Sequence, residues 1–315
     1  MAGLRAHLLA GLALALAPAA TLMAQDPAPE TPSAEPTENE IIVEGYTEKE
    51  VRNFLWRSVI PTGRVIAKRT GPVCVGIDNV PAVLSEPLKA RIEHNLDTLG
   101  IERATPGCKV NAVIVFDRDA HGFVNALSRY EGGAAFDALY LPERRRLIEP
   151  VRPAYNWHYM NLEQLQQFLG TPQPLTRQGA SLGRGFQGVG FDNSAESRLA
   201  LYATPAEISK TFSVVDIDTI DGITIEQLGD YLTMQMLVEF RPDVKGWVPA
   251  DSILNLFTPS GANPDAPPEM STLDRIIVRE MYRTRGNYGN GAIRNSIARA
   301  SVRELEQTGA LLAQR

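Results

Sequence analysis

The chain has 315 residues, 44% of them hydrophobic and 22% charged, which is enough for one sizeable core or two smaller ones. Of its 31 basic and 37 acidic residues, Arg5 and five acidic residues of segment 25–40 lie outside the part that we expect to fold. The remaining 30 basic and 32 acidic residues nearly balance, which gives no reason to expect nucleic acid or an anionic membrane as a partner.

Residues 1–24 have the pattern of a cleavable signal peptide. Arg5 and His7 form a short basic start. Residues 8–20 are an apolar run of Leu, Ala and Gly that is broken only by Pro18 near its end. The apolar run is shorter than the ~20 residues that a membrane-spanning helix needs, and Ala24 offers the small residue that a signal peptidase requires. We therefore expect a periplasmic or secreted protein without a transmembrane span after cleavage.

Residues 25–40 are expected to be a disordered, acidic, Pro-rich linker. The segment holds four prolines and five acidic residues but no aromatic residue and no Val, Ile or Leu. It cannot bury enough apolar surface to offset the entropy of ordering it.

Residues 41–170 read as an N-terminal α/β subdomain. After a short apolar run at 41–43, a helix is expected over 48–58, with Val51, Leu55 and Trp56 facing inward. A strand over 73–77, a helix capped by Ser85 that stops at Gly100, and a strand over 111–116 then form a βαβ unit. At this spacing the two strands are expected to be parallel.

The chain has two cysteines, Cys74 and Cys108, which lie at or just before the starts of these two strands. In an exported chain we expect them to form a disulfide. The alternative is a pair of buried free thiols.

A further helix is expected from Asn161 to Gly170, followed by a Gly-rich loop over 171–196. Inside this loop, residues 179–183 match G-x-S-x-G and residues 183–188 match G-x-G-x-x-G. Both motifs work only between a strand and a helix, and neither element is expected here. The four histidines also all precede Ser181, so we reject a hydrolase triad on this serine.

Residues 197–315 read as a C-terminal, helix-rich α+β subdomain. A strand is expected over 212–217, followed by three helices. Thr224 and Gln227 form a capping box for the first helix, and Ile223 and Leu228 occupy the hydrophobic-staple positions. The second helix opens at Ser271 and ends near residue 285, and the third begins near Ala292.

Metal-binding signals are weak throughout the sequence. There is no H-E-x-x-H motif, and no two histidines stand at ligand spacing. Trp157-His158 is more typical of a buried packing pair than of a ligand, and Arg144–Arg146 of a solvated helix face. We therefore expect no metal and no cofactor.

Several segments resemble an uncharacterised family of exported alphaproteobacterial proteins. The resemblance lies in Ile223–Leu232, Leu273–Tyr282, Gly71–Cys74, Cys108–Asn111 and Trp157-His158. It implies export and assigns no activity.

The same C-terminal helix pair is distantly similar to zincin-like metallopeptidase relatives. In that register Glu226 stands where a zinc-binding histidine would be, Gln227 where the catalytic glutamate would be, and Asp230 where the later ligand would be. An amide cannot take a proton from a zinc-bound water, and no imidazole remains to hold the metal. The resemblance therefore implies a fold rather than an activity.

The sequence thus predicts an α+β fold, with a small mixed sheet that contains the βαβ unit and a helix-rich C-terminal part. The expected function is a non-catalytic binding or structural module of the cell envelope, whose partner is a protein or small ligand. The alternative is a hydrolase-type enzyme on a zincin-like fold with a degenerate metal site. Glu226, Asp230 and His158 are the weak candidate site residues.

Overall fold

The computed structural model describes residues 46–59, 66–130, 135–136, 139, 141–161, 207–241, 248–283 and 290–313. The predicted signal peptide, the linker, the apolar run at 41–43 and the Gly-rich loop lie outside these residues, as does the predicted helix after Asn161. Within the described residues, no helix is long and apolar enough to cross a membrane.

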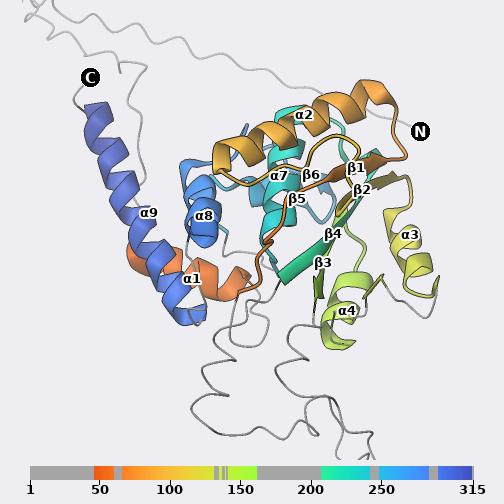
Figure 1. The fold of residues 1–315 in the computed structure, drawn as a ribbon, viewed down its shortest axis with the longest axis horizontal. Coiled ribbons are helices and arrows are strands. Elements are labelled where there is room, and N and C mark those ends of the chain that lie inside the picture. The colour runs from red at the N-terminus through yellow and green to blue at the C-terminus, as the bar shows by residue number, and fades with distance from the viewer. Residues whose placement is uncertain are drawn as a thin grey trace, which may run out of the picture. The chain divides into compact units, whose positions relative to one another are not determined.

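A four-stranded mixed sheet forms the centre of the fold (Figure 1). Its strands, in spatial order, are β1 (Val75–Asp78), β2 (Ala112–Asp117), β4 (Glu207–Asp216) and β3 (Ala154–Asn161). The first three are mutually parallel, and β3 runs antiparallel to β4 at the edge. This arrangement confirms the predicted α+β class and mixed sheet.

The predicted βαβ unit is present as β1, α2 (Ala82–Leu99) and β2, with β1 and β2 parallel. The helix stops where the sequence indicated, because Gly100 adopts the left-handed conformation at φ 70° that favours glycine at a helix end. Its start differs from the prediction. Pro81 is the N-cap rather than Ser85, and the Pro81 carbonyl accepts hydrogen bonds from the amides of Leu84 and Ser85.

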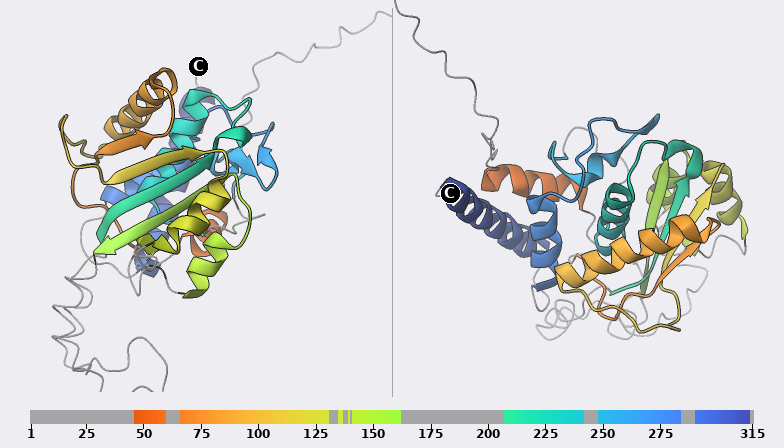
Figure 2. Two further views of the ribbon diagram at one scale, coloured as in Figure 1. Left: turned by 90° about the vertical axis from the view of Figure 1, so that its right-hand side faces the viewer. Right: turned by 90° about the horizontal axis from the view of Figure 1, so that it is seen from above.

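Helices cover the two faces of the sheet unequally. On one face, α2 and α7 (Ile225–Leu237) bury Ile114, Phe116 and Val215 in the larger hydrophobic core. On the other face, α3 (Ala120–Leu127) and α4 (Leu141–Ile148) cover a smaller core around Trp157, whose ring stacks on Phe212 at 5.1 Å between centroids. Both layers are visible in the right-hand view of Figure 2.

Three further helices extend the larger core. They are α8 (Thr272–Arg283), α9 (Asn290–Ala313) and α1 (Glu48–Ser58), and α1 packs along α9 (Figure 2). The bounds of α1 match the prediction, but Trp56 does not face inward, since 48% of it is exposed. Phe54 takes the buried position instead, and the guanidinium of Arg294 lies 4.2 Å from the centre of the Trp56 ring.

The short elements between α7 and α8 form a separate group, which is called the η4–β5 wall below. They are the 3-10 helix η4 (Ile253–Leu256) and the hairpin of β5 (Phe257–Thr258) and β6 (Gly261–Ala262). A further 3-10 turn, η3 (Ile217–Thr219), follows β4. Because β4 bonds to both β2 and β3, the described parts of the two predicted subdomains share one sheet.

Candidate functional site

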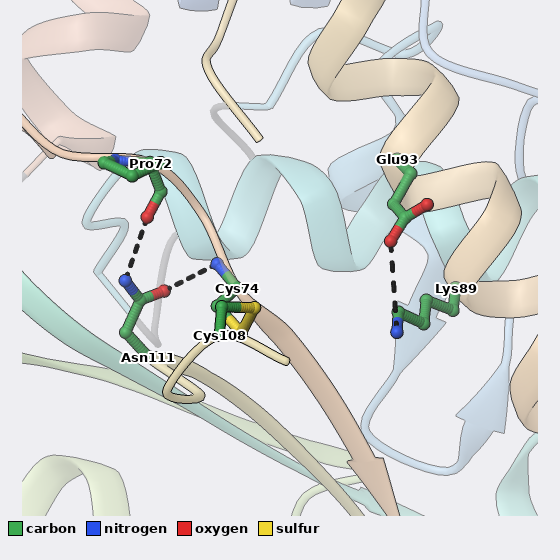
Figure 3. Close-up of a disulfide and its surroundings, with 6 residues drawn as sticks. All are labelled: Pro72, Cys74, Lys89, Glu93, Cys108 and Asn111. Atoms are coloured by element: carbon green, nitrogen blue, oxygen red, sulfur yellow. Dashed lines mark hydrogen bonds and ion pairs between the residues drawn. A yellow bond between two sulfur atoms is a disulfide. The ribbon is translucent and has the colours of Figure 1, made fainter. Parts of the chain in front are cut away.

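Cys74 and Cys108 form the predicted disulfide (Figure 3). The bridge joins the residue before β1 to the loop before β2, and Asn111 reinforces it. The Asn111 amide donates to the Pro72 carbonyl at 3.0 Å, and its Oδ1 accepts from the Cys74 amide at 2.9 Å. All these groups are engaged with one another, so we assign the bridge and its surroundings a structural role.

Asp230 is fully buried at the meeting point of α2, α7 and the start of α8. Its carboxylate accepts two bonds from the Arg91 guanidinium, at 2.6 and 2.8 Å, one from the Asn95 amide at 2.7 Å and one from the Met270 backbone at 2.6 Å. The neighbouring Gly229 allows this contact, because a Cβ there would lie 2.6 Å from Cγ of Arg91. Asp230, the candidate zinc ligand, therefore serves to link α7 to α2 and to the start of α8.

Glu226 lies apart from Asp230, exposed in the first turn of α7. The predicted capping box is present here. The Thr224 hydroxyl accepts from the Gln227 amide at 3.2 Å, and Oε1 of Gln227 accepts from the Thr224 amide at 3.0 Å. The described residues contain no group of His, Cys, Asp and Glu that could hold a metal ion.

His158 lies on β3, buried beneath α7, and does not meet Glu226 or Asp230. Burial, and then the charge of Arg69, lower the pKa of His158 to about 4, so the ring is neutral at pH 7. The backbone of Met236 and Gln235 lies near the ring and favours its charged form slightly. Even so, neither ring nitrogen has a hydrogen-bond partner of good geometry among the described residues.

The carboxyl ends of the parallel strands carry a group of aspartates, at an edge where α/β proteins often bind ligands. Asp117 and Asp216 are directly paired across β2 and β4. Each accepts a hydrogen bond from the backbone two residues on, Asp117 from Asp119 at 2.8 Å and Asp216 from Asp218 at 3.1 Å. Burial and the neighbouring carboxylates raise the pKa of Asp216. These aspartates shape turns, and nothing else in the described residues points to a ligand there.

The site with converging groups is a cleft of 520 Å³ between the start of β3, the end of α4, α7 and the η4–β5 wall. A second hollow, of 570 Å³, is lined only by Asp97 and residues 100–106, so separate elements do not meet in it. The described walls of the cleft are mainly apolar, with several amides and arginines among them: Ser58, Leu147, Pro150, Val151, Arg152, Pro153, Ala154, Asn156, Tyr231, Gln235, Phe240, Arg241, Val248, Leu254, Asn255, Phe257, Thr258, Pro259 and Asn263.

Three of the polar side chains in the cleft come from β3 and α7: Asn156, Tyr231 and Gln235. The Asn156 amide donates to the Tyr231 hydroxyl at 3.1 Å, and the Tyr231 ring packs edge-on against Phe257 at 5.1 Å. Burial raises the pKa of Tyr231 to about 12, although hydrogen bonds from Asn156 and Gln235 act against it. Oδ1 of Asn156 is buried and has no hydrogen-bond partner among the described residues.

Arginines supply the charge of the cleft. The Arg241 backbone amide donates to the Ser58 carbonyl at 2.7 Å, which fixes the backbone of Arg241 beside the end of α1. Nη2 of Arg152 donates to the Arg146 carbonyl at 3.0 Å. Burial and then the charge of Arg241 lower the pKa of Arg294, on α9, to about 10. The described lining residues include no Asp or Glu.

Few features of the sequence indicate this site. Arg152 and Arg241 stand alone in the sequence, and the amides of the cleft come from well-separated segments. One available signal was the alternation of Tyr155, Trp157 and Tyr159, which is typical of a strand with one buried face. It indicates β3 and places Asn156 and His158 on the opposite face from the aromatic residues.

Comparison of the chain with protein-family models, curated proteins and solved structures finds no match. The function therefore has to be inferred from the site itself.

Proposed function

We propose that this chain is an exported protein of the bacterial cell envelope that binds a small molecule in the cleft and does not transform it. Export is supported by the signal-peptide pattern of residues 1–24. It is also supported by the Cys74–Cys108 disulfide, because such bonds persist mainly in oxidising compartments.

The observation that carries the binding function is the cleft. Its volume of 520 Å³ falls within the ~300–1,000 Å³ that is usual for small-molecule sites. Phe240, Leu254 and Phe257 offer apolar surface, while Asn156 and Gln235 provide the few polar groups that fix a ligand's orientation. A mainly apolar pocket with a few converging polar groups is the usual composition of a ligand site.

The same walls favour binding over catalysis. The described lining residues include no His, Cys, Lys, Asp or Glu, so the hydroxyls of Ser58 and Thr258 have no general base among them to activate them. Tyr231, with its pKa raised to about 12, stays protonated at neutral pH. The zincin-like alternative finds no support in the carboxylates that it needs, because Asp230 is fully bonded and Glu226 is exposed.

The binding function can be tested with N-phenyl-1-naphthylamine, a neutral apolar dye that fluoresces when it leaves water. We expect saturable binding to the mature protein. Replacing Ala154, which lines the cleft at the start of β3, with Phe fills part of the space and should weaken dye affinity at least about tenfold, since the loss of a few buried carbons costs that much.

Ala82→Phe is the matched control, because Ala82 is exposed at the start of α2 and lies outside the cleft. It should leave dye affinity unchanged. Both variants are first checked for a wild-type circular dichroism spectrum and melting curve. Absence of dye binding to the wild type, or equal binding by a folded Ala154→Phe variant, would refute the proposed function.

A further inference from the structure

The charge of the cleft is unusual for a site with mostly apolar walls. Arg152 and Arg241 both line it, and no described lining residue carries a negative charge. Glu239 is close in sequence, but burial and the charge of Glu143 raise its pKa to about 8. Glu239 is therefore mostly protonated at neutral pH and does not offset the arginines.

Arg241 is the cation that is most available to a ligand. Its backbone is fixed by the bond to Ser58, while its guanidinium takes part in none of the ion pairs of the described residues. Arg152 is already partly engaged, since it donates to the Arg146 carbonyl at 3.0 Å. The planar guanidinium of Arg241 presents several N–H donors that match an oxyanion.

Arg294 adds a second positive charge that interacts with that of Arg241. Arg294 is 1% exposed and feels the positive charge of Arg241, and like charges in a poorly solvated region repel each other. A negative group placed at Arg241 would offset this repulsion and accept hydrogen bonds from its guanidinium. The neutral amides of the cleft cannot do so.

We propose that the ligand is a small organic anion, with a carboxylate, sulfonate or phosphate group bound at Arg241 and an apolar body against Phe240, Leu254 and Phe257. This inference rests on the proposed function, because it specifies the ligand of the same cleft. The apolar walls exclude a bare inorganic anion as the best occupant, since it would leave them in contact with water. Oδ1 of Asn156, buried without a partner, adds a place for one hydroxyl or amine of the ligand.

A matched pair of dyes separates the two proposals. 8-Anilinonaphthalene-1-sulfonate has the ring system of N-phenyl-1-naphthylamine plus one sulfonate. We expect the wild-type protein to bind the sulfonate dye more tightly than the neutral dye. Arg241→Gln should weaken the sulfonate dye by roughly 10- to 100-fold, as expected for the loss of a charged hydrogen bond. It should weaken the neutral dye much less, by under about threefold, because that dye has no anionic group for the guanidinium to bind.

Two further variants control for charge. Arg241→Lys keeps the positive charge and should retain most of the preference for the sulfonate dye. Arg299→Gln removes one arginine from an exposed position of α9 and should change neither affinity, although it alters the net charge by the same amount. Arg152→Gln should weaken the sulfonate dye less than Arg241→Gln does.

The outcomes distinguish the two proposals. Equal wild-type affinity for the two dyes would overturn the anionic ligand and leave the small-molecule cleft standing. A preference for the sulfonate dye that persists in both Arg241→Gln and Arg152→Gln would overturn the role of the arginines. Failure of both dyes to bind would refute the proposed function and this inference together.

Discussion

Asp230 shows how a carboxylate in a motif-like position can serve the fold alone. Its register resembles that of a metal ligand, yet both of its oxygens are occupied by Arg91, Asn95 and the Met270 backbone. A buried charge of this kind is tolerated because its partners replace the hydrogen bonds of water. Freeing the carboxylate for a metal would leave Arg91 without this partner.

We predict that Asp230→Asn lowers the free energy of unfolding by about 3 kcal/mol, as is typical when one partner of a buried ion pair is removed. The new amide would set a donor against the donors of Arg91 and Asn95. Urea denaturation provides the measurement. Glu226→Gln, at an exposed position, should change stability by less than about 0.5 kcal/mol. The reverse ranking would contradict the structural role of Asp230.

Residue roles were the least predictable part of the molecule. The Thr224 capping box could be recognised because its partners stand three residues apart and depend on local geometry. Trp56 was wrongly expected to face the core, because the helical pattern places it beside Leu55 and says nothing of Arg294, which lies far along the chain and stacks on the ring. Arg241 gave no signal, since its neighbours in the cleft belong to other segments.

At the scale of elements, the side of the sheet beneath α7 is polar at its β3–β4 end. His158 pairs with Thr211 across these strands, and Asn156 pairs with Ser213. The Arg69 guanidinium donates to the Thr211 hydroxyl at 3.3 Å. The pairing also keeps a neutral imidazole next to a guanidinium, which makes this part of the sheet sensitive to acid.

We predict that His158 makes the fold less stable as the pH falls from 6.5 to 4. The folded-state pKa of about 4 lies below the ordinary histidine value of 6.5, so in this window the unfolded chain binds a proton that the folded chain does not. Stability from this residue is fully present above pH 6.5 and is lost as the pH falls. The difference between the two pKa values amounts to about 3 kcal/mol.

The measurement compares unfolding free energies of the wild type and His158→Phe at several pH values. Asp274, whose pKa burial raises to about 6, has the opposite effect, because its stabilising contribution is lost as the pH rises. It titrates in both proteins, so the difference between them isolates His158. If the unfolding free energies of the two proteins change in parallel from pH 6.5 to 4, His158 does not titrate as the structure indicates.

Elements with local start and stop signals could be predicted, whereas those defined by distant partners could not. The bounds of α1 match because its capping residues lie within the helix or next to it. The strand β3, which ends at Asn161, was not expected, although its aromatic residues alternate. This segment forms a strand because it pairs with β4, some 50 residues later along the chain.

At the scale of the whole molecule, the parallel βαβ unit could be predicted from the sequence. The full strand order β1-β2-β4-β3 could not. The connection between β1 and β2 is short and helical, which leaves little choice of topology. The insertion of β4 between β2 and β3 depends on contacts between distant segments. The cleft therefore could not be predicted, since it opens beside this edge of the sheet.

We predict that the double variant Cys74→Ala, Cys108→Ala unfolds at a lower denaturant concentration, with a loss of about 3–4 kcal/mol. The two cysteines are 34 residues apart, and the bridge removes the entropy of this loop from the unfolded chain. Denaturation of both proteins without reductant provides the measurement.

Dye binding should be preserved in the folded double variant, because the bridge lies at the starts of β1 and β2 while the cleft opens where β3 begins. Non-reducing mass spectrometry of the mature wild-type protein should detect no free thiol. Two thiols that react with iodoacetamide in the native protein would contradict the bridge.

The unequal division of the core has a consequence for how the molecule opens. The α3–α4 layer rests on a small cluster around Trp157, whereas the opposite face is continuous with α1, α8 and α9. Partial openings cost free energy in proportion to the apolar contacts that they break. Amide protons of α3 and α4 should therefore exchange with solvent through a local excursion, which also loosens the side of the cleft that the end of α4 forms. Those of α2 and α7 should exchange only when the whole chain unfolds.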